Sequence, residues 1–293
     1  MQRRLVRWGL RIILAPLLLV MIHVIIFRFV PVPITPLMVV RTIEGEGLNH
    51  QWVSIDDMSP HLARAAIASE DNRFCEHSGV DWSAVRTVFD EYREEGRLRG
   101  ASTISMQTVK NLYFLPGRSV IRKGLEVAIV PLLEAVWPKK RIIEVYLNIA
   151  EMGAGIYGVE AASRHYWGES AKQLNAKQSA ALASILPAPR RRNPTVRNRF
   201  MRQRAAKIEN TQSQLGPLLG CVPPVSQRRS IGPKGPVSKA ASAIPVHVGD
   251  PAAVPVPIPL ELEETKGEDE ATPEKPRRSK RKKVRTKRRR RSR

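Results

Sequence analysis

Residues 59–82 read SPHLARAAIASEDNRFCEHSGVDW, an apolar segment that ends in a dense group of charges. Ser59 is a suitable N-cap, and Pro60 suits the first helical position. On a helix that begins there, Leu62 and Glu70 lie on one face, so Glu70 continues the apolar stripe. Desolvation of a carboxylate on such a face favours proton exchange near neutral pH. The stretch therefore predicts a helix that ends in a reactive carboxylate.

A second segment, residues 100–134, combines polar donors, cations and an apolar stripe. Glu126 lies at helical spacing from Val130 and Leu133, so it is a second carboxylate on an apolar face. Cations at this density suit a diphosphate. The hydroxyl, amide and cationic side chains are Ser102, Thr103, Ser105, Gln107, Lys110, Arg118, Arg122 and Lys123.

Both carboxylates also have an ordinary structural interpretation. Glu70 could cap its helix or pair with Arg73 three residues later, and the pattern alone favours that interpretation. Glu126 could form a helix-surface ion pair with Arg122, four residues before it. Pro131 is expected to kink this helix or to mark a point where it is irregular.

The N-terminal region predicts a membrane anchor. Residues 12–27 contain no Lys, Arg, Asp or Glu, and Arg11 and Arg28 can reach the interfaces from either end. A cleaved signal peptide and a buried core helix are the alternatives, but no small-residue cleavage site follows the run. The excess of basic residues before it places residues 1–11 in the cytoplasm, a transmembrane helix over 12–30, and the rest outside.

The remainder divides into a body and a tail. Residues 35–212 have mostly helical periodicity, and Asn175 with Gln178 has the spacing of a capping box. Residues 213–293 are rich in Pro and then in charge, which predicts disorder. We therefore expect a mainly α protein with one domain between an anchor and a disordered tail.

The strong positive charge of the chain favours an anionic partner. The formal charge is +22, and residues 277–293 contain 13 Lys or Arg among 17 residues. Such a run binds anions, but nucleic acid is a weak candidate because no aromatic residue interleaves with it and the tail is expected outside the cytoplasm.

The two cysteines, Cys75 and Cys221, form neither a disulfide framework nor a zinc cluster, so two unpaired thiols are favoured. The histidines lack metal-ligand spacing, and His77 is interpreted as a hydrogen-bonding residue.

Four ordered segments resemble the motifs of the peptidoglycan glycosyltransferase family, glycosyltransferase family 51, in its short monofunctional form. They are EDNRFCEHSGVD (70–81), GASTISMQTVKN (100–111), RKGLEVAIVPLLE (122–134) and KKRIIEVYLNIAEMGAGIYGVEAASRHYWG (139–168). Within the second segment Met106 and Thr108 depart from the usual pattern, without loss of a charge. The tail after about residue 212 has no counterpart in the family.

The resemblance implies a lysozyme-like helical domain that polymerises lipid II, the lipid-linked disaccharide of the cell wall. Glu70 would be the general base that deprotonates the acceptor hydroxyl, and transfer would proceed with inversion. Lys110 and Arg118 would contact diphosphates. Glu126 would assist the leaving diphosphate, directly or through a divalent ion such as Mg²⁺ or Mn²⁺, although no cofactor is firmly implied. Weaker supporting assignments fall on Asp71, Gln107, Arg122, Lys123, Ser102 and Thr103.

The implied partners are lipid II, the nascent glycan chain and the membrane, with cell-wall or division proteins beside them. The implied location is the bacterial inner membrane, with the catalytic domain in the periplasm. The basic tail, which the resemblance does not cover, is expected to be solvated and disordered, with attachment to anionic lipid or wall polymer as the alternative.

The sequence fits three other functions less well. A lysozyme-like wall-degrading enzyme has no reason to gather diphosphate-binding cations. A membrane-tethered polyanion-binding protein would depend on the tail alone. A transpeptidase is disfavoured because SKRK at Ser279 lies in the charged run with no K-T-G after it.

Overall fold

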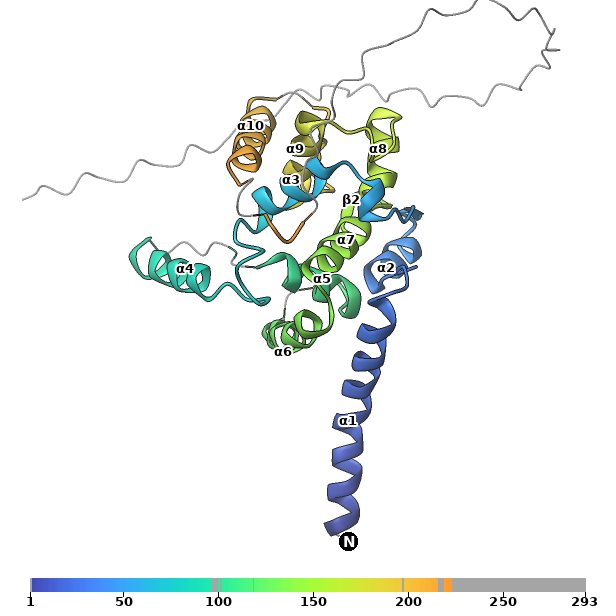
Figure 1. Cartoon of the computed structure of the whole chain (residues 1–293). Helices are drawn as coiled ribbons and strands as arrows, with labels where there is room; N and C mark the ends of the chain where they lie inside the picture. Colours follow the sequence, from blue (N-terminus) through green and yellow to red (C-terminus); the bar gives the residue numbers. More distant parts are fainter. Residues whose placement is uncertain are drawn as a thin grey trace, which may run out of the picture. The chain divides into compact units, whose positions relative to one another are not determined.

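The computed structural model describes residues 2–222 apart from 96–99, 101, 118, 197 and 216–218. The chain separates into two compact units, Met1–Ile231 and Gly232–Arg293, and all described residues belong to the first. Most of the predicted tail, including the basic run, lies outside the described residues. The described part is mainly helical, as predicted (Figure 1).

The elements follow one another as helices with three very short strands. The helices are α1 (Gln2–Phe27), α2 (Pro36–Ile43), α3 (Pro60–Glu70), α4 (Trp82–Glu95), α5 (Ile104–Tyr113), α6 (Val120–Val136), α7 (Lys139–Ile149), α8 (Val159–Trp167), α9 (Ala176–Ile185) and α10 (Arg199–Gln214), with a 3₁₀ turn at Ile55–Asp57. The strands β1 (Asn49–His50), β2 (Glu151–Gly153) and β3 (Ile156–Tyr157) form a sheet in the order β1-β3-β2, with β3 parallel to β1 and antiparallel to β2.

Local sequence signals set several of these boundaries. Helix α3 begins at Pro60 after Ser59, as the sequence predicts. Helix α9 carries the predicted capping box, in which the Asn175 side chain accepts from the Gln178 backbone and the Gln178 side chain accepts in return. Helix α6 continues through Pro131 without ending. Helix α10 ends at Gln214, close to the expected end of the body.

Two groups of helices hold the site. Helices α3, α9 and α10 pack on one another, α5 packs on α6 and α7, and α7 also packs on α3 (Figure 1). Ile67 of α3, Ile104 of α5 and Ile143 of α7 are completely buried in one continuous core. Burial of each such side chain contributes roughly 1.5–3 kcal/mol. The C-terminal end of α3 is thereby fixed against α5.

Gly79 lets the loop after α3 lie tightly on α6. Its φ is +95°, and a Cβ at this position would meet Val130 Cγ1 at 2.2 Å. An L side chain would be strained by the backbone and would also collide with the helix. The glycine of the first motif is therefore required by a close approach, and the approach fixes the loop that carries His77.

Helix α1 continues into the body at its C-terminal end. Trp137 Nε1 donates to the carbonyl of Val24 at 2.7 Å, and the Arg141 guanidinium donates to the carbonyl of Phe27 at 2.9 Å. Val24 is completely buried. Among the described residues, no helix combines the length and the apolar content that crossing a membrane requires.

A disulfide joins Cys75 to Cys221, with Cα atoms 5.6 Å apart. The prediction of two unpaired thiols was therefore wrong. The bond ties the loop that follows Glu70 to the segment that follows α10, where Leu219 and Val222 are also buried. A separation of 146 residues gives no spacing signal, although the expected location outside the cytoplasm is one where disulfides form.

We expect the double variant Cys75→Ser/Cys221→Ser to lose about 2–4 kcal/mol of unfolding free energy, because the unfolded chain is no longer constrained by the cross-link. Urea unfolding of the oxidised protein, the reduced protein and the double variant measures this. The reduced protein should match the double variant. Equal midpoints for all three samples would show that the bond contributes nothing to stability.

Candidate active site

Glu70 is the last residue of α3, and its side chain is mostly buried. Its side chain is 13% exposed. Ser69 Oγ donates to Glu70 Oε1 at 2.9 Å, and Gln107 Nε2 donates to Oε2 at 3.2 Å. Arg204 Nη2 lies 3.7 Å from Oε1. The carboxylate thus accepts two neutral hydrogen bonds beside one cation, and it keeps part of its surface open to a substrate.

The ion pair considered between Glu70 and Arg73 is not formed. The Arg73 guanidinium pairs instead with Glu76 at 2.7 Å and with Asp81 at 3.4 Å. The structural interpretation that the pattern favoured for Glu70 is wrong in this respect, because Arg73 follows the end of the helix and points along the loop. The cation at Glu70 comes from α10.

Asp71 organises the loop. Its carboxylate accepts from the backbone N–H of Ile104 at 3.0 Å, at the start of α5, and from His77 Nε2 at 2.9 Å. His77 Nδ1 accepts from the Gly79 N–H at 3.1 Å, so Nε2 carries the proton. Both side chains are buried. Asp71 therefore links the loop to α5, and His77 has the hydrogen-bonding role that the sequence indicated.

Gln107 is oriented by a residue that sequence reasoning missed. The Tyr146 hydroxyl donates to Gln107 Oε1 at 3.2 Å, which turns the amide N–H₂ toward Glu70. Burial raises the pKa of the Tyr146 phenol well above its usual value, so the hydroxyl remains a neutral donor. The orientation of this amide is thus fixed from α7.

Glu126 lies at the centre of a group of cations. It is 1% exposed, and its two oxygens accept from Arg122 Nη1 and, at 3.1 Å, from Lys123 Nζ. Lys123 also donates to Ser102 Oγ at 3.0 Å. The ion pair with Arg122 that was considered as an alternative is formed, but around a buried carboxylate and not on the helix surface.

Lys110 adds a third cation from α5. Its ammonium group makes no hydrogen bond or salt bridge to any described residue, and the side chain reaches solvent. Desolvation by the surrounding protein is the main cause that lowers its pKa; Glu126 opposes the shift, whereas Arg122 and Lys123 add to it. Glu126 is thus paired with two cations, and Lys110 adds a third positive charge that acts on it without a direct bond. Arg118, the remaining predicted diphosphate ligand, lies outside the described residues.

Helix α5 connects the two carboxylates. Gln107 and Lys110 are three residues apart and share one face of the helix, so the first reaches Glu70 and the second lies near Glu126. Thr103 caps the start of α5 by accepting from the Met106 N–H at 3.2 Å, and its hydroxyl donates to the Gly79 carbonyl. Thr103 is buried and joins the start of α5 to the loop after α3, and its contact with substrate stays a prediction.

The donor set does not fit a divalent ion at Glu126. Both of its oxygens accept from cationic side chains, and the described residues contain no group of three His, Cys, Asp or Glu side chains that converge. A divalent ion at Glu126 would have to displace Arg122 and Lys123 from its carboxylate. The arrangement instead suits an anion on the cations.

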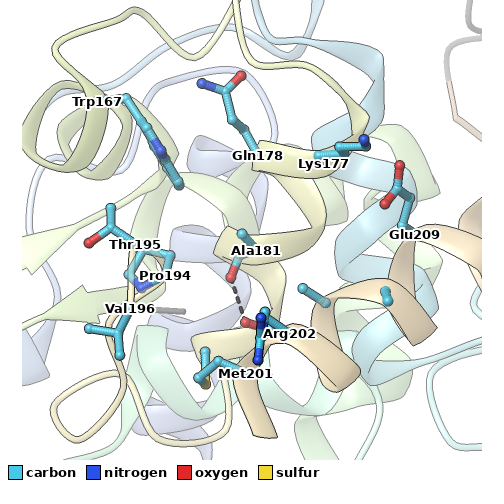
Figure 2. A pocket seen from close by; sticks show the side chains of 13 residues that line it. Trp167, Lys177, Gln178, Ala181, Pro194, Thr195, Val196, Met201, Arg202 and Glu209 are labelled. Atoms are coloured by element: carbon cyan, nitrogen blue, oxygen red, sulfur yellow. Dashed lines mark hydrogen bonds between the residues drawn. The ribbon is translucent and has the colours of Figure 1, made fainter. Parts of the chain in front are cut away.

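A separate hollow of about 580 Å³ lies between α9, α10 and the segment around Thr195. Figure 2 shows Trp167, Lys177 and Arg202 among the side chains around it. The hollow does not include Glu70 or the cation cluster. It is therefore not part of the candidate active site.

Similarity to known proteins agrees with this geometry. A profile described as transglycosylase matches residues 38–212, more than half of the chain. The chain belongs to the transglycosylase family. Proteins named biosynthetic peptidoglycan transglycosylase are similar to it over most of their length. The Rhodospirillum centenum protein is 49% identical over 199 residues, which cover 67% of this chain and 86% of that protein.

Two further relatives carry the same name. The Marinomonas sp. protein is 50% identical over 201 residues, 69% of this chain and 88% of its own length. The Caulobacter vibrioides protein is 47% identical over 210 residues, 70% and 92% of the two chains. The similarity thus extends over nearly the whole of each relative.

The transglycosylase domain combines predicted and unpredicted site residues. The structure brings Gln107 to Glu70, and it brings Lys110, Arg122 and Lys123 to Glu126. Sequence reasoning missed three residues around Glu70. Tyr146 lies within a segment that resembles a family motif, but the other two, Ser69 and Arg204, had no distinguishing signal. Arg204 is one of many arginines in a basic stretch beyond the last motif.

Proposed function

We propose that this transglycosylase is a peptidoglycan glycosyltransferase that polymerises lipid II into β-1,4-linked glycan strands and releases undecaprenyl diphosphate. The observation that carries the proposal is the pairing of Arg122 and Lys123 with one buried carboxylate, in the same domain as a partly open Glu70. Helix α5 joins the two, because Gln107 donates to Glu70 and the charge of Lys110 acts on Glu126. A sugar diphosphate needs both features, a base for the acceptor and positive charge for the leaving group.

On the acceptor side, Glu70 takes the proton from the 4-hydroxyl of the acceptor sugar as that oxygen attacks the anomeric carbon of the donor. The bond to the diphosphate oxygen breaks with its electron pair, and the configuration inverts from α to β. The neutral donors Ser69 and Gln107 hold the carboxylate while leaving acceptor capacity for the proton.

On the donor side, the cations bind and neutralise the diphosphate as it departs, so a strong general acid is not required. Glu126 acts through Arg122 and Lys123, because it fixes both side chains from a buried position. Lys110 carries no competing ion pair with a described residue, and it is available to the phosphates.

The proposal is tested by incubating the purified protein with lipid II and, separately, with finished cell wall. Consumption of lipid II with release of undecaprenyl diphosphate supports the polymerase. Release of soluble fragments from finished wall, with lipid II untouched, would overturn it in favour of a wall-degrading enzyme.

We also propose that α1 anchors the enzyme in the bacterial inner membrane, with the catalytic domain outside the cytoplasm. Support comes from the large apolar side chains that α1 exposes, which are Leu14, Leu17, Leu18, Leu19, Ile22, Ile25 and Ile26. Both lipid-linked substrates would then meet the active site in two dimensions.

We expect a variant that lacks residues 2–19 to leave the membrane fraction while keeping its fold, because the buried contacts of α1 lie beyond residue 19. Sedimentation of membranes, followed by circular dichroism of the soluble protein, measures both properties. The full-length chain is the control. A truncated protein that still sediments with membranes and resists carbonate extraction would contradict the anchor.

A further inference from the structure

We propose that Arg204, on α10, is a positioning residue for Glu70 at the end of α3. The inference rests on the proposed glycosyl transfer and extends it to a helix that lies beyond the motif segments. Helix α10 packs against both α3 and α9 (Figure 1). It can therefore hold the C-terminal end of α3 independently of α5.

The Arg204 guanidinium is held at three points. Its Nε donates to the Ser184 carbonyl of α9 at 3.0 Å, and its Nη2 donates to Ser69 Oγ at 3.2 Å. The same Nη2 lies 3.7 Å from Glu70 Oε1. Ser69 in turn donates to that oxygen at 2.9 Å. The cation thus reaches Glu70 directly by its charge and indirectly through a hydroxyl.

This arrangement differs from a neutralising salt bridge. At 3.7 Å the guanidinium occupies no lone pair of the carboxylate, which accepts only from Ser69 and Gln107 among the described residues. A carboxylate has about four acceptor positions, so two remain for the acceptor sugar. A positive charge at this distance attracts the carboxylate and holds it in place without using the positions that the acceptor sugar needs.

Among the charged and titratable groups around Glu70, Arg204 is the one that supplies a positive charge to the carboxylate. On α7, Tyr146 is neutral because burial raises the pKa of its phenol. The neighbouring Asp71 is occupied by His77 and by the start of α5. Arg192 lies near Arg204, where its charge acts on the guanidinium. In the described part of the chain, Arg204 is the only cation within salt-bridge distance of Glu70.

The test compares Arg204→Gln, Arg204→Lys and Ser69→Ala with the full-length enzyme on lipid II in detergent. We expect Arg204→Gln to lower kcat about 10- to 100-fold with little change in KM, since a misplaced base slows chemistry more than binding. Arg204→Lys should restore much of the lost kcat, because it returns a positive charge to the same position, and Ser69→Ala should have an intermediate effect.

Arg202→Gln is the matched control, because Arg202 lies on the same helix, is exposed and makes no side-chain hydrogen bond or salt bridge with a described residue. It should behave as the wild type does. A wild-type enzyme that leaves lipid II untouched would end the proposed function itself. With an active wild type, an unchanged kcat in Arg204→Gln would overturn the positioning role. A loss of thermal stability that accounts for equal losses of kcat in Arg204→Gln and Arg204→Lys would overturn it too.

Discussion

Replacing Glu70 by glutamine is expected to lower the rate of lipid II polymerisation by about 10²–10⁴-fold, the usual contribution of a general base. The amide keeps the shape of the side chain and can still accept from Ser69 or Gln107, but it cannot take up the proton of the acceptor hydroxyl. Glycan formation from labelled lipid II measures the loss. Thermal unfolding should show a fold close to that of the wild type.

Glu76→Gln is a matched control, because Glu76 belongs to the same motif and pairs with Arg73 at the surface. Surface ion pairs contribute little, so this variant should retain both activity and stability. A Glu70→Gln enzyme with normal turnover would contradict the mechanism. Equal losses in both variants would indicate damage to the loop and not removal of a base.

Local patterns predicted the parts of the site that depend on spacing within one helix. Helix α3 begins at Pro60, and Glu70 ends it on the covered side, because capping and apolar periodicity are written in neighbouring residues. The pair formed by Arg122 and Glu126 follows from the same i, i+4 rule. The spacing of Glu126 from Val130 and Leu133 also placed this carboxylate on an apolar face, and the structure buries all three side chains.

Contacts between distant segments could not be predicted in this way. Arg204 approaches Glu70 only because α10 packs on α3, and no local signal singles it out from the other arginines near it. The cysteine pair was missed for the same reason, since Cys75 and Cys221 meet only after the domain is complete. In both cases the residues were visible in the sequence, but their partners were set by tertiary packing.

The second large effect is expected for Glu126→Gln, which removes the charge that holds Arg122 and Lys123 in place. Without it the two cations repel each other and Lys110, and their side chains are exposed enough to turn toward solvent. The diphosphate then meets a less ordered group of donors. Because preorganised charge is the main source of leaving-group stabilisation, we expect a loss of about 10²–10³-fold in kcat.

Glu134→Gln supplies the control for this last experiment, because Glu134 is a largely buried carboxylate on the same helix and is paired with Lys139 at 2.7 Å. It lies outside the cation cluster, so its loss should reduce stability more than turnover. Single-turnover kinetics with lipid II, together with thermal unfolding, separate the two effects. If Glu126→Gln turns over normally, the cations hold the diphosphate without their carboxylate. If Glu134→Gln loses as much activity, the effect belongs to the packing of α6 and not to the charge at Glu126.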